Sequence, residues 1–164
     1  MNSIAMHVGR VIVWLQTAGH ALDLAIRLYV AEIFFRSGLL KVSNWDGTLY
    51  LFREQYHVPF LPPVAAAWLG TFGELAFPPL LAIGLASRFA ALSLSVVNVM
   101  AVISFWHVLA ENEAARMSHF HWGLLLLVTL CHGPGKLSAD YWIKRHYPPP
   151  RGAFGPELRR APPA

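Results

Sequence analysis

Charged residues and cysteine are both scarce in this sequence of 164 residues. Lys, Arg, Asp and Glu make up 13% of the chain, and 55% of it is hydrophobic, whereas roughly a quarter of an ordinary soluble domain is charged. A soluble fold of this size would expose more apolar surface than its few charges could cover. The single cysteine, Cys131, excludes an intrachain disulfide and any zinc or iron–sulfur site built only from cysteines of one chain. The composition indicates a membrane protein.

Motifs of well-understood enzymes are missing as well. The sequence contains no P-loop, no GxSxG, no HExxH and no CxxC, so it does not predict kinase, hydrolase or metalloprotease chemistry. The net charge of +4 does not favour nucleic acid, because the basic residues lie at the ends of apolar stretches and in the C-terminal tail. Anionic lipid is the expected partner for charges in these places.

Four apolar stretches are expected to cross the bilayer, which takes about 20 residues each. They cover about residues 22–41, 62–86, 88–109 and 119–133, the last being short. Segment 4–20 predicts an N-terminal interfacial helix, and segment 46–56 predicts a short interfacial helix between spans one and two. Pro78 and Pro79 predict a kink in the second span. The expected fold is an all-α membrane four-helix bundle.

The domain organisation follows from the same pattern. Residues 1–147 are expected to form a single membrane domain that contains the four spans and the two interfacial helices. Residues 148–164 are rich in proline and basic residues and poor in aliphatic ones. Such a segment cannot bury a core and is predicted to be disordered.

The first span carries five charged residues, although each charge at membrane depth is costly. They are Asp23, Arg27, Glu32, Arg36 and Lys41. Asp23–Arg27 and Glu32–Arg36 are i,i+4 pairs with the acid first, the more favourable order. Lys41 lies at a helix end, from which its amine can also extend to the headgroups.

Glu74 lies near the middle of the second span and is the expected complement to these charges. Because spans one and two are antiparallel, Glu74 is expected to reach Arg27 or Arg36, and Asn98 falls at a similar depth on span three. The sequence therefore predicts a buried polar cluster or ligand pocket formed by Arg27, Glu32, Arg36, Lys41, Glu74 and Asn98. Two interpretations stay open, namely paired charges that fix the helix register and a cavity for a ligand or a proton path.

Four histidines map to one side of the expected membrane domain: His57, His107, His119 and His121. Histidines at one level can bind copper, zinc or haem iron, can contact a quinone carbonyl, or can simply pack. On a continuous helix, however, His119 and His121 point about 160° apart and cannot easily share a metal. We expect no metal site, and we regard His107 and His121 as candidate proton or quinone contacts.

Three stretches occur in a characteristic order: RLYVAEIFFRSGLLKV, GELAFPPLLAIGLASRFAAL and HWGLLLLVTLCHGPGKLSAD. Together they resemble the DoxX family of small four-helix bacterial membrane proteins, over about residues 22–143. The resemblance is carried by Arg27, Gly38, Lys41, Glu74, Gly84, Arg88, Gly133, Gly135, Ser138 and Asp140. It implies a redox-associated protein of the bacterial inner membrane with a quinone as electron partner.

A longer match through Trp45, YHVPFLPP and VVNVMAVIS looks like one DoxX branch, whose members are often encoded beside iron-dependent enzymes that modify small metal-handling peptides. The first functional hypothesis is therefore a membrane subunit of a quinone-linked oxidoreductase or of a metal- or oxidative-stress-associated system, with a protein partner. In this hypothesis the region of Arg27 and Glu74 binds a quinone or a small oxidised substrate. The alternative is a non-enzymatic membrane anchor or small-solute permease for a cytoplasmic partner. The residues themselves predict no catalytic centre and no further cofactor.

The distribution of Lys and Arg outside the spans predicts that both termini are cytoplasmic, because cytoplasmic loops carry an excess of these residues. The inner set has eight members: Arg10, Arg88, Lys136, Lys144, Arg145, Arg151, Arg159 and Arg160. The outer set has three: Lys41, Arg53 and Arg116. Reporter fusions or cysteine labelling at residues 50 and 113 are expected to place both positions outside. Labelling of either position only from the cytoplasm would contradict this topology.

Overall fold

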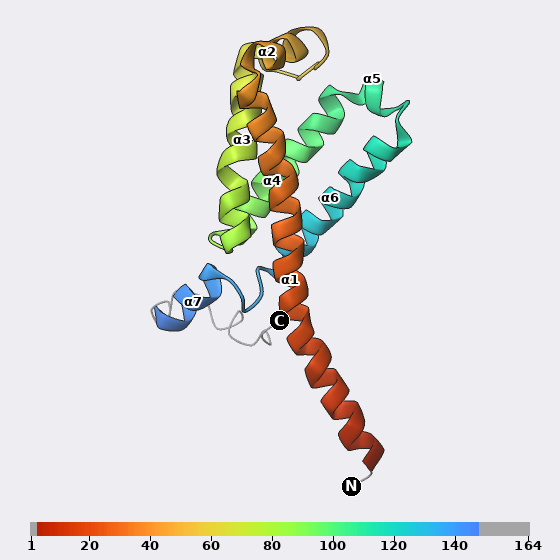
Figure 1. The fold of residues 1–164 in the computed structure, drawn as a ribbon, viewed down its shortest axis with the longest axis vertical. Coiled ribbons are helices and arrows are strands. Elements are labelled where there is room, and N and C mark those ends of the chain that lie inside the picture. Colours follow the sequence, from red (N-terminus) through yellow and green to blue (C-terminus); the bar gives the residue numbers. More distant parts are fainter. Residues whose placement is uncertain (1–2, 148–164) are drawn as a thin grey trace.

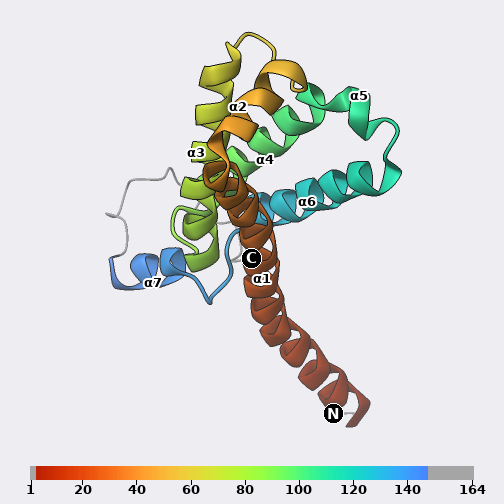
Figure 2. The ribbon, with the colours of Figure 1, turned by 45° about the horizontal axis from the view of Figure 1, so that its top comes forward.

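The computed structural model describes residues 3–147, and the predicted tail at 148–164 lies outside them. The described part is all-helical, and four long helices form the bundle: α1 (Ser3–Ser43), α3 (Pro63–Ile83), α4 (Ser87–Ser104) and α6 (Glu113–His132). Three short helices accompany them: α2 (Trp45–Glu54), α5 (Trp106–Leu109) and α7 (Ala139–His146). Figure 1 shows the arrangement, and Figure 2 shows α2 and α5 at one end of the bundle with α7 toward the other. The predicted all-α membrane bundle is confirmed.

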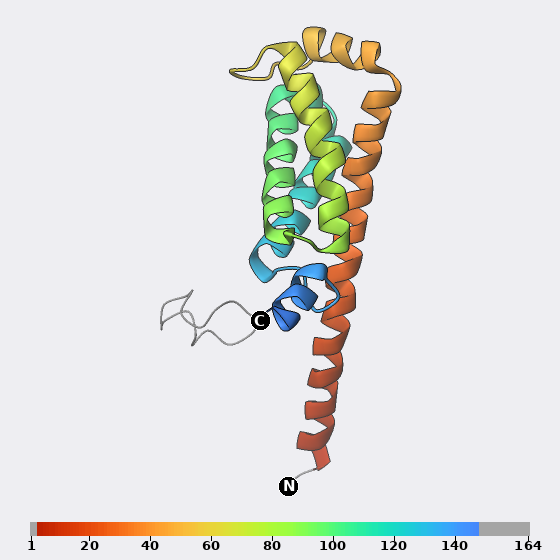
Figure 3. The same ribbon diagram turned by 90° about the vertical axis from the view of Figure 1, so that its left-hand side faces the viewer.

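Helix α1 is longer than the sequence predicted. The interfacial helix expected at 4–20 and the span expected at 22–41 are parts of one helix of 41 residues, which is roughly 60 Å long at 1.5 Å per residue. No proline occurs between residues 3 and 43, so nothing in the chain forces a break there. Figure 3 shows that the N-terminal part of α1 extends beyond the other long helices.

The α3–α4 hairpin turns within three residues. Helix α3 continues through Pro78 and Pro79 to Ile83, so the prolines do not end it. Gly84 ends it, with φ at 74°, a left-handed conformation that suits glycine. The bonds Leu85 N–H to Leu80 O and Gly84 N–H to Leu81 O form a Schellman motif. Helices α3 and α4 are each long and apolar enough to cross a membrane, judged by length and composition.

The boundaries of the remaining long helices also differ from those of the predicted spans. The expected span at 88–109 divides at Phe105 into α4 and the short helix α5. Helix α6 begins at Glu113, six residues before the predicted start at 119, because the Asn112 side chain accepts a hydrogen bond from Ala115 N and caps the helix. The short interfacial helix predicted at 46–56 corresponds to α2.

All four long helices contribute to one hydrophobic core. Its buried members include Val30 and Phe34 of α1, Leu81 of α3, Leu94 of α4 and Leu126 of α6. A second, smaller cluster packs Phe52 of α2 against α3. The bundle is therefore held by apolar contacts along its length, with α2 packed across one end.

The start of α4 is fixed by a carboxylate from α7. Asp140 accepts hydrogen bonds from Ala86 N at 2.8 Å, Ser87 N at 2.8 Å and Ser87 Oγ at 2.9 Å. The backbone N–H of Asp140 also donates to Gly84 O at 2.9 Å. A negative charge at a helix N-terminus satisfies free N–H groups and complements the helix dipole. Asp140 thus ties α7 to the α3–α4 hairpin.

The substitution Asp140→Asn is expected to destabilise the protein by about 1–2 kcal/mol, because the amide removes the charge and turns one acceptor into a donor. Thermal unfolding in detergent measures this loss. Asp46→Asn, the same change on the exposed first turn of α2, is the matched control and should have a smaller effect. Equal melting shifts for the two variants would contradict the role given to Asp140.

Candidate functional site

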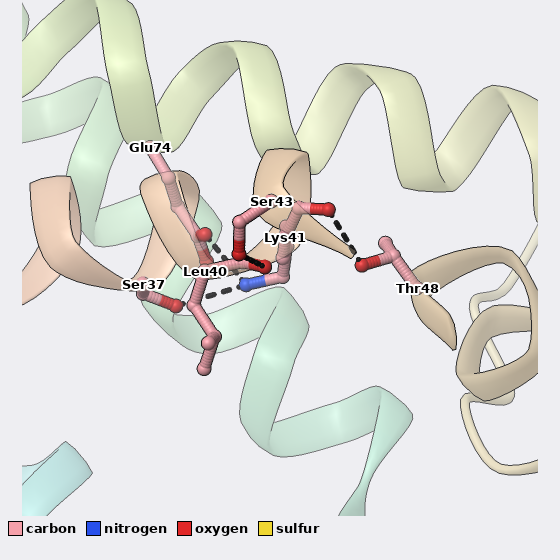
Figure 4. Close-up of polar contacts among 6 residues, drawn as sticks. All are labelled: Ser37, Leu40, Lys41, Ser43, Thr48 and Glu74. Carbon is pink, nitrogen blue, oxygen red and sulfur yellow. Dashed lines mark hydrogen bonds and ion pairs between the residues drawn. The ribbon is translucent and has the colours of Figure 1, made fainter. Parts of the chain in front are cut away.

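A buried ion pair joins α1 to α3. Lys41 Nζ donates to Glu74 Oε2 at 2.5 Å and to Ser37 Oγ at 2.9 Å, as Figure 4 shows. The Lys41 and Glu74 side chains are only 18% and 10% exposed. At such burial the two charges neutralise each other, and removal of one would strand the other.

Gly38 sets the level at which this pair forms. A Cβ atom on Gly38 would lie 2.9 Å from the Leu75 side chain and 3.1 Å from the Glu74 carbonyl carbon. A residue without a side chain therefore lets α1 approach α3 closely at Glu74. Lys41 lies one helical turn further along α1, and its carbonyl accepts a hydrogen bond from Thr48 Oγ1 at 3.0 Å. This hydrogen bond holds the turn between α1 and α2 next to the Lys41–Glu74 pair.

Two cavities meet at the Lys41–Glu74 pair. The first, here named the α3/α4 cavity, has a volume of about 220 Å³, and its lining includes Phe52, Leu69, Val96, Met100 and Ser104. The second, named the α1/α6 cavity, has a volume of about 410 Å³, and its lining includes Phe34, Arg36, Ser37, His119 and Trp122. Lys41, Tyr56, Glu74, Val97 and Ala101 line both. The ion pair is thus part of the wall between an apolar space and a more polar one.

Tyr56 forms another part of this shared wall. Its ring stacks between Phe52 and Phe105, with centroid distances of 4.7 and 4.8 Å. Burial, and secondly the negative charge of Glu74, raise the pKa of Tyr56 above its usual value. The phenol therefore remains protonated at neutral pH and is available as a hydrogen-bond donor.

His119 is held in one tautomer by Asn98. The Asn98 amide donates to the His119 carbonyl at 2.9 Å, and its oxygen lies 2.9 Å from His119 Nδ1. Because an amide oxygen only accepts, Nδ1 carries the proton in this pairing, and Nε2 is the acceptor of the neutral ring. The sequence missed His119 as a site residue, because spacing along one helix does not reveal a partner on another.

The predicted polar cluster is only partly formed. Arg27 is fully buried, as expected, but its guanidinium donates to backbone carbonyls: Leu81 O at 3.2 Å, Ala82 O at 3.0 Å and Leu137 O at 2.5 Å. The prediction that Glu74 reaches Arg27 or Arg36 is wrong, because its partner is Lys41. Arg27 lies eleven residues before Gly38, so it is roughly 16 Å from the level of Glu74.

The expected interior position is wrong for Glu32 and Arg36. They pair with each other at 2.8 Å on the surface of α1, with side chains 58% and 77% exposed. The helical period explains this result, because Arg36 lies on the opposite side of α1 from Arg27. Arg36 nevertheless borders the α1/α6 cavity, so one of the two remains near the site.

The two histidines proposed as ligand contacts lie elsewhere. His107 packs against His57 with a ring distance of 5.3 Å at the α5 end of the bundle, and His121 is exposed on α6. Neither is among the residues that line the two cavities. Among the residues that the structure describes, no three His, Cys, Asp or Glu side chains lie close enough to hold a metal ion.

The Lys41–Glu74 pair supports a double-mutant prediction. Glu74→Gln is expected to lower the free energy of unfolding by about 3–5 kcal/mol because it strands the Lys41 ammonium, whereas replacing both residues by Met should cost less than Glu74→Gln alone. Thermal unfolding in detergent measures both. Glu54→Gln, at the exposed C-terminal end of α2, is the control and should change the free energy of unfolding by less than about 0.5 kcal/mol. Equal losses for Glu74→Gln and Glu54→Gln would contradict a buried pair.

Comparison with known proteins shows the family to which the chain belongs. The DoxX family model matches residues 22–107, a range that contains Lys41, Tyr56, Glu74 and Asn98. An uncharacterized protein of Haemophilus influenzae is 34% identical over 135 residues, which cover 76% of this chain and 85% of that protein. No solved structure matches the chain. The chain belongs to the DoxX family.

Proposed function

We propose that this DoxX protein is a membrane subunit of a quinone-linked redox system and that it binds the quinone beside the Lys41–Glu74 pair. The observation that carries the proposal is the placement of a buried, mutually neutralised ion pair in the wall of two cavities. Buried ionisable groups that line a cavity inside a membrane bundle are typical of ligand sites or proton paths.

The donors around the pair fit an uncharged ligand with carbonyl oxygens. Lys41 uses two of its three N–H groups on Glu74 and Ser37, which leaves one for a ligand. Tyr56 supplies a protonated phenol in the same wall. A bound quinone would supply the two-electron chemistry, with electrons from a partner protein. The part of this chain would be to hold the carbonyl oxygens through the hydrogen-bond donors of Lys41 and Tyr56.

The proposed location is the bacterial inner membrane, with both termini in the cytoplasm. Arg88, Lys136 and Lys144 belong to the end of the bundle near α7, whereas Asp46 and Glu54 belong to α2 at the opposite end. An excess of basic residues at the α7 end supports a cytoplasmic position for it.

A membrane anchor is the second candidate, and one observation favours it. The N-terminal part of α1 extends beyond the other long helices and exposes Val8, Val11, Trp14 and Leu15. Such a helix could hold a cytoplasmic partner without any ligand in the bundle. The anchor differs from the redox subunit in requiring no occupant next to Lys41 and Glu74.

Ligand binding separates the two candidates. The purified protein is expected to yield a quinone in an organic extract and to bind decylubiquinone in detergent. Tyr56→Phe keeps the ring stack but removes the hydroxyl, so it should weaken decylubiquinone binding about 5- to 10-fold. Tyr50→Phe, on the exposed face of α2, is the matched control and should leave binding unchanged. A protein that neither contains nor binds a quinone would be an anchor rather than a redox subunit.

A further inference from the structure

We infer that the ligand ring occupies the α3/α4 cavity, where the Ser104 hydroxyl donates a hydrogen bond to it, and that the ligand is an uncharged, mainly apolar molecule that enters from the lipid. The assignment rests on the ligand-binding function proposed above and names the cavity, the contact residue and the chemical class. It is carried by Ser104, by the position of the cavity mouth and by the donors that line the wall.

Ser104 has a buried hydroxyl without a partner. The residue is 2% exposed and lines the α3/α4 cavity. Its Oγ makes no hydrogen bond within the described part of the chain, whereas Ser95 on the same helix donates to the Ala91 carbonyl at 2.8 Å. A buried hydroxyl left unpaired is unfavourable by roughly 1–3 kcal/mol, so such a group requires an explanation. A ligand acceptor in the cavity supplies one.

The backbone holds Ser104 firmly in this place. The Ser104 carbonyl accepts a hydrogen bond from His57 N at 2.9 Å, which ties the end of α4 to the segment between α2 and α3. Thr71 Oγ1 is also buried without a partner among residues 3–147, but Thr71 lines neither cavity. Of these two residues, only Ser104 borders the α3/α4 cavity.

The mouth of the α3/α4 cavity opens on the outer surface of the bundle. Its lining includes Leu69 of α3 and Val96 of α4, and both side chains are exposed. Leu69 lies six residues into α3, or roughly 9 Å below its start, and Val96 lies eight residues before the end of α4. In a bundle that spans the bilayer, these positions face hydrocarbon. The ligand therefore reaches the cavity from the lipid.

The residues that line the α3/α4 cavity disfavour a charged ligand. Glu74 already neutralises Lys41, so an anionic or cationic ligand would add an uncompensated charge in a buried site. The remaining N–H of Lys41, the phenol of Tyr56 and the hydroxyl of Ser104 can all donate, and most other lining residues are apolar. A cavity of about 150 Å³ holds a benzene ring, so about 220 Å³ accommodates one substituted six-membered ring with carbonyl oxygens.

The α1/α6 cavity has a different character. It is larger and is bordered by Arg36, Ser37 and His119, which are groups that water hydrates well. We therefore assign the ligand ring to the α3/α4 cavity. We expect water to occupy the α1/α6 cavity beside the ion pair.

The test compares Ser104→Ala with Ser95→Ala in the full-length protein. Ser104→Ala is expected to lower decylubiquinone affinity about 5- to 10-fold, while the melting temperature without ligand stays the same or rises, because an unpaired buried hydroxyl has been removed. Ser95→Ala, whose hydroxyl bonds to its own helix, should leave affinity unchanged. Decylbenzene, which has the same chain and no carbonyl, is the control probe. It should bind more weakly than decylubiquinone and equally to wild type and Ser104→Ala.

The contrary outcomes separate this inference from the proposed function. Unchanged decylubiquinone affinity in Ser104→Ala, together with a loss in Tyr56→Phe, would leave the proposed function standing and overturn the role of Ser104. A lower melting temperature of ligand-free Ser104→Ala would show that the hydroxyl has a structural partner such as water, and would also overturn it. Equal binding of decylbenzene and decylubiquinone to wild type would overturn recognition of carbonyl oxygens altogether.

Discussion

The structure depends on one constraint, which is that the charges on the inward-facing side of α1 must find partners within the bundle because hydrocarbon offers none. Arg27 and Lys41 lie two heptads apart and within about 40° of each other around the helix, so both face inward. The Arg27 guanidinium donates through its two terminal nitrogens to three carbonyls at the end of α3 and before α7, whereas its Nε has no hydrogen-bond partner within the described part of the chain. Lys41 is satisfied by the carboxylate of Glu74. The packing of α3 against α1 follows from these two attachments.

The two attachments have different consequences. Arg27 donates its hydrogen bonds to backbone carbonyls. Residue 84 is a glycine at a position where a Cβ would lie 2.5 Å from the Arg27 guanidinium. That end of the bundle is filled and fixed. Lys41 and Glu74 cancel each other's charge, leave one ammonium proton free and border two cavities. The two inward-facing cations of α1 therefore have different roles. Arg27 attaches α1 to backbone carbonyls, and Lys41 forms an ion pair that borders two cavities.

The sequence predicts the helices well and their contacts poorly, for a physical reason. Apolar length and turn residues are local properties, so the four long helices and α2 could be located from the chain alone. The partner of Glu74 could not, because it depends on the register between α1 and α3, which Gly38 sets by close approach. The helical period places Arg36 on the opposite side of α1 from Arg27, but it does not tell which of the two sides faces the bundle. His119 likewise becomes a site residue only through Asn98 on another helix.

The break between α4 and α5 occurs at Phe105, which packs against the segment after α2. An unbroken helix to residue 109, as the sequence predicted, would continue α4 past the end of the cavity. Instead Phe105 leaves the helical conformation, with φ at −116° and ψ at 21°, and its ring stacks on Tyr56. This stack, continued by Phe52, connects α2 to the end of α4 at the level of Ser104. The aromatic stack and the bond from His57 N to Ser104 O hold Tyr56 and Ser104 in the wall of one cavity. The break between α4 and α5 therefore places two hydroxyl groups in the cavity that the ion pair also lines.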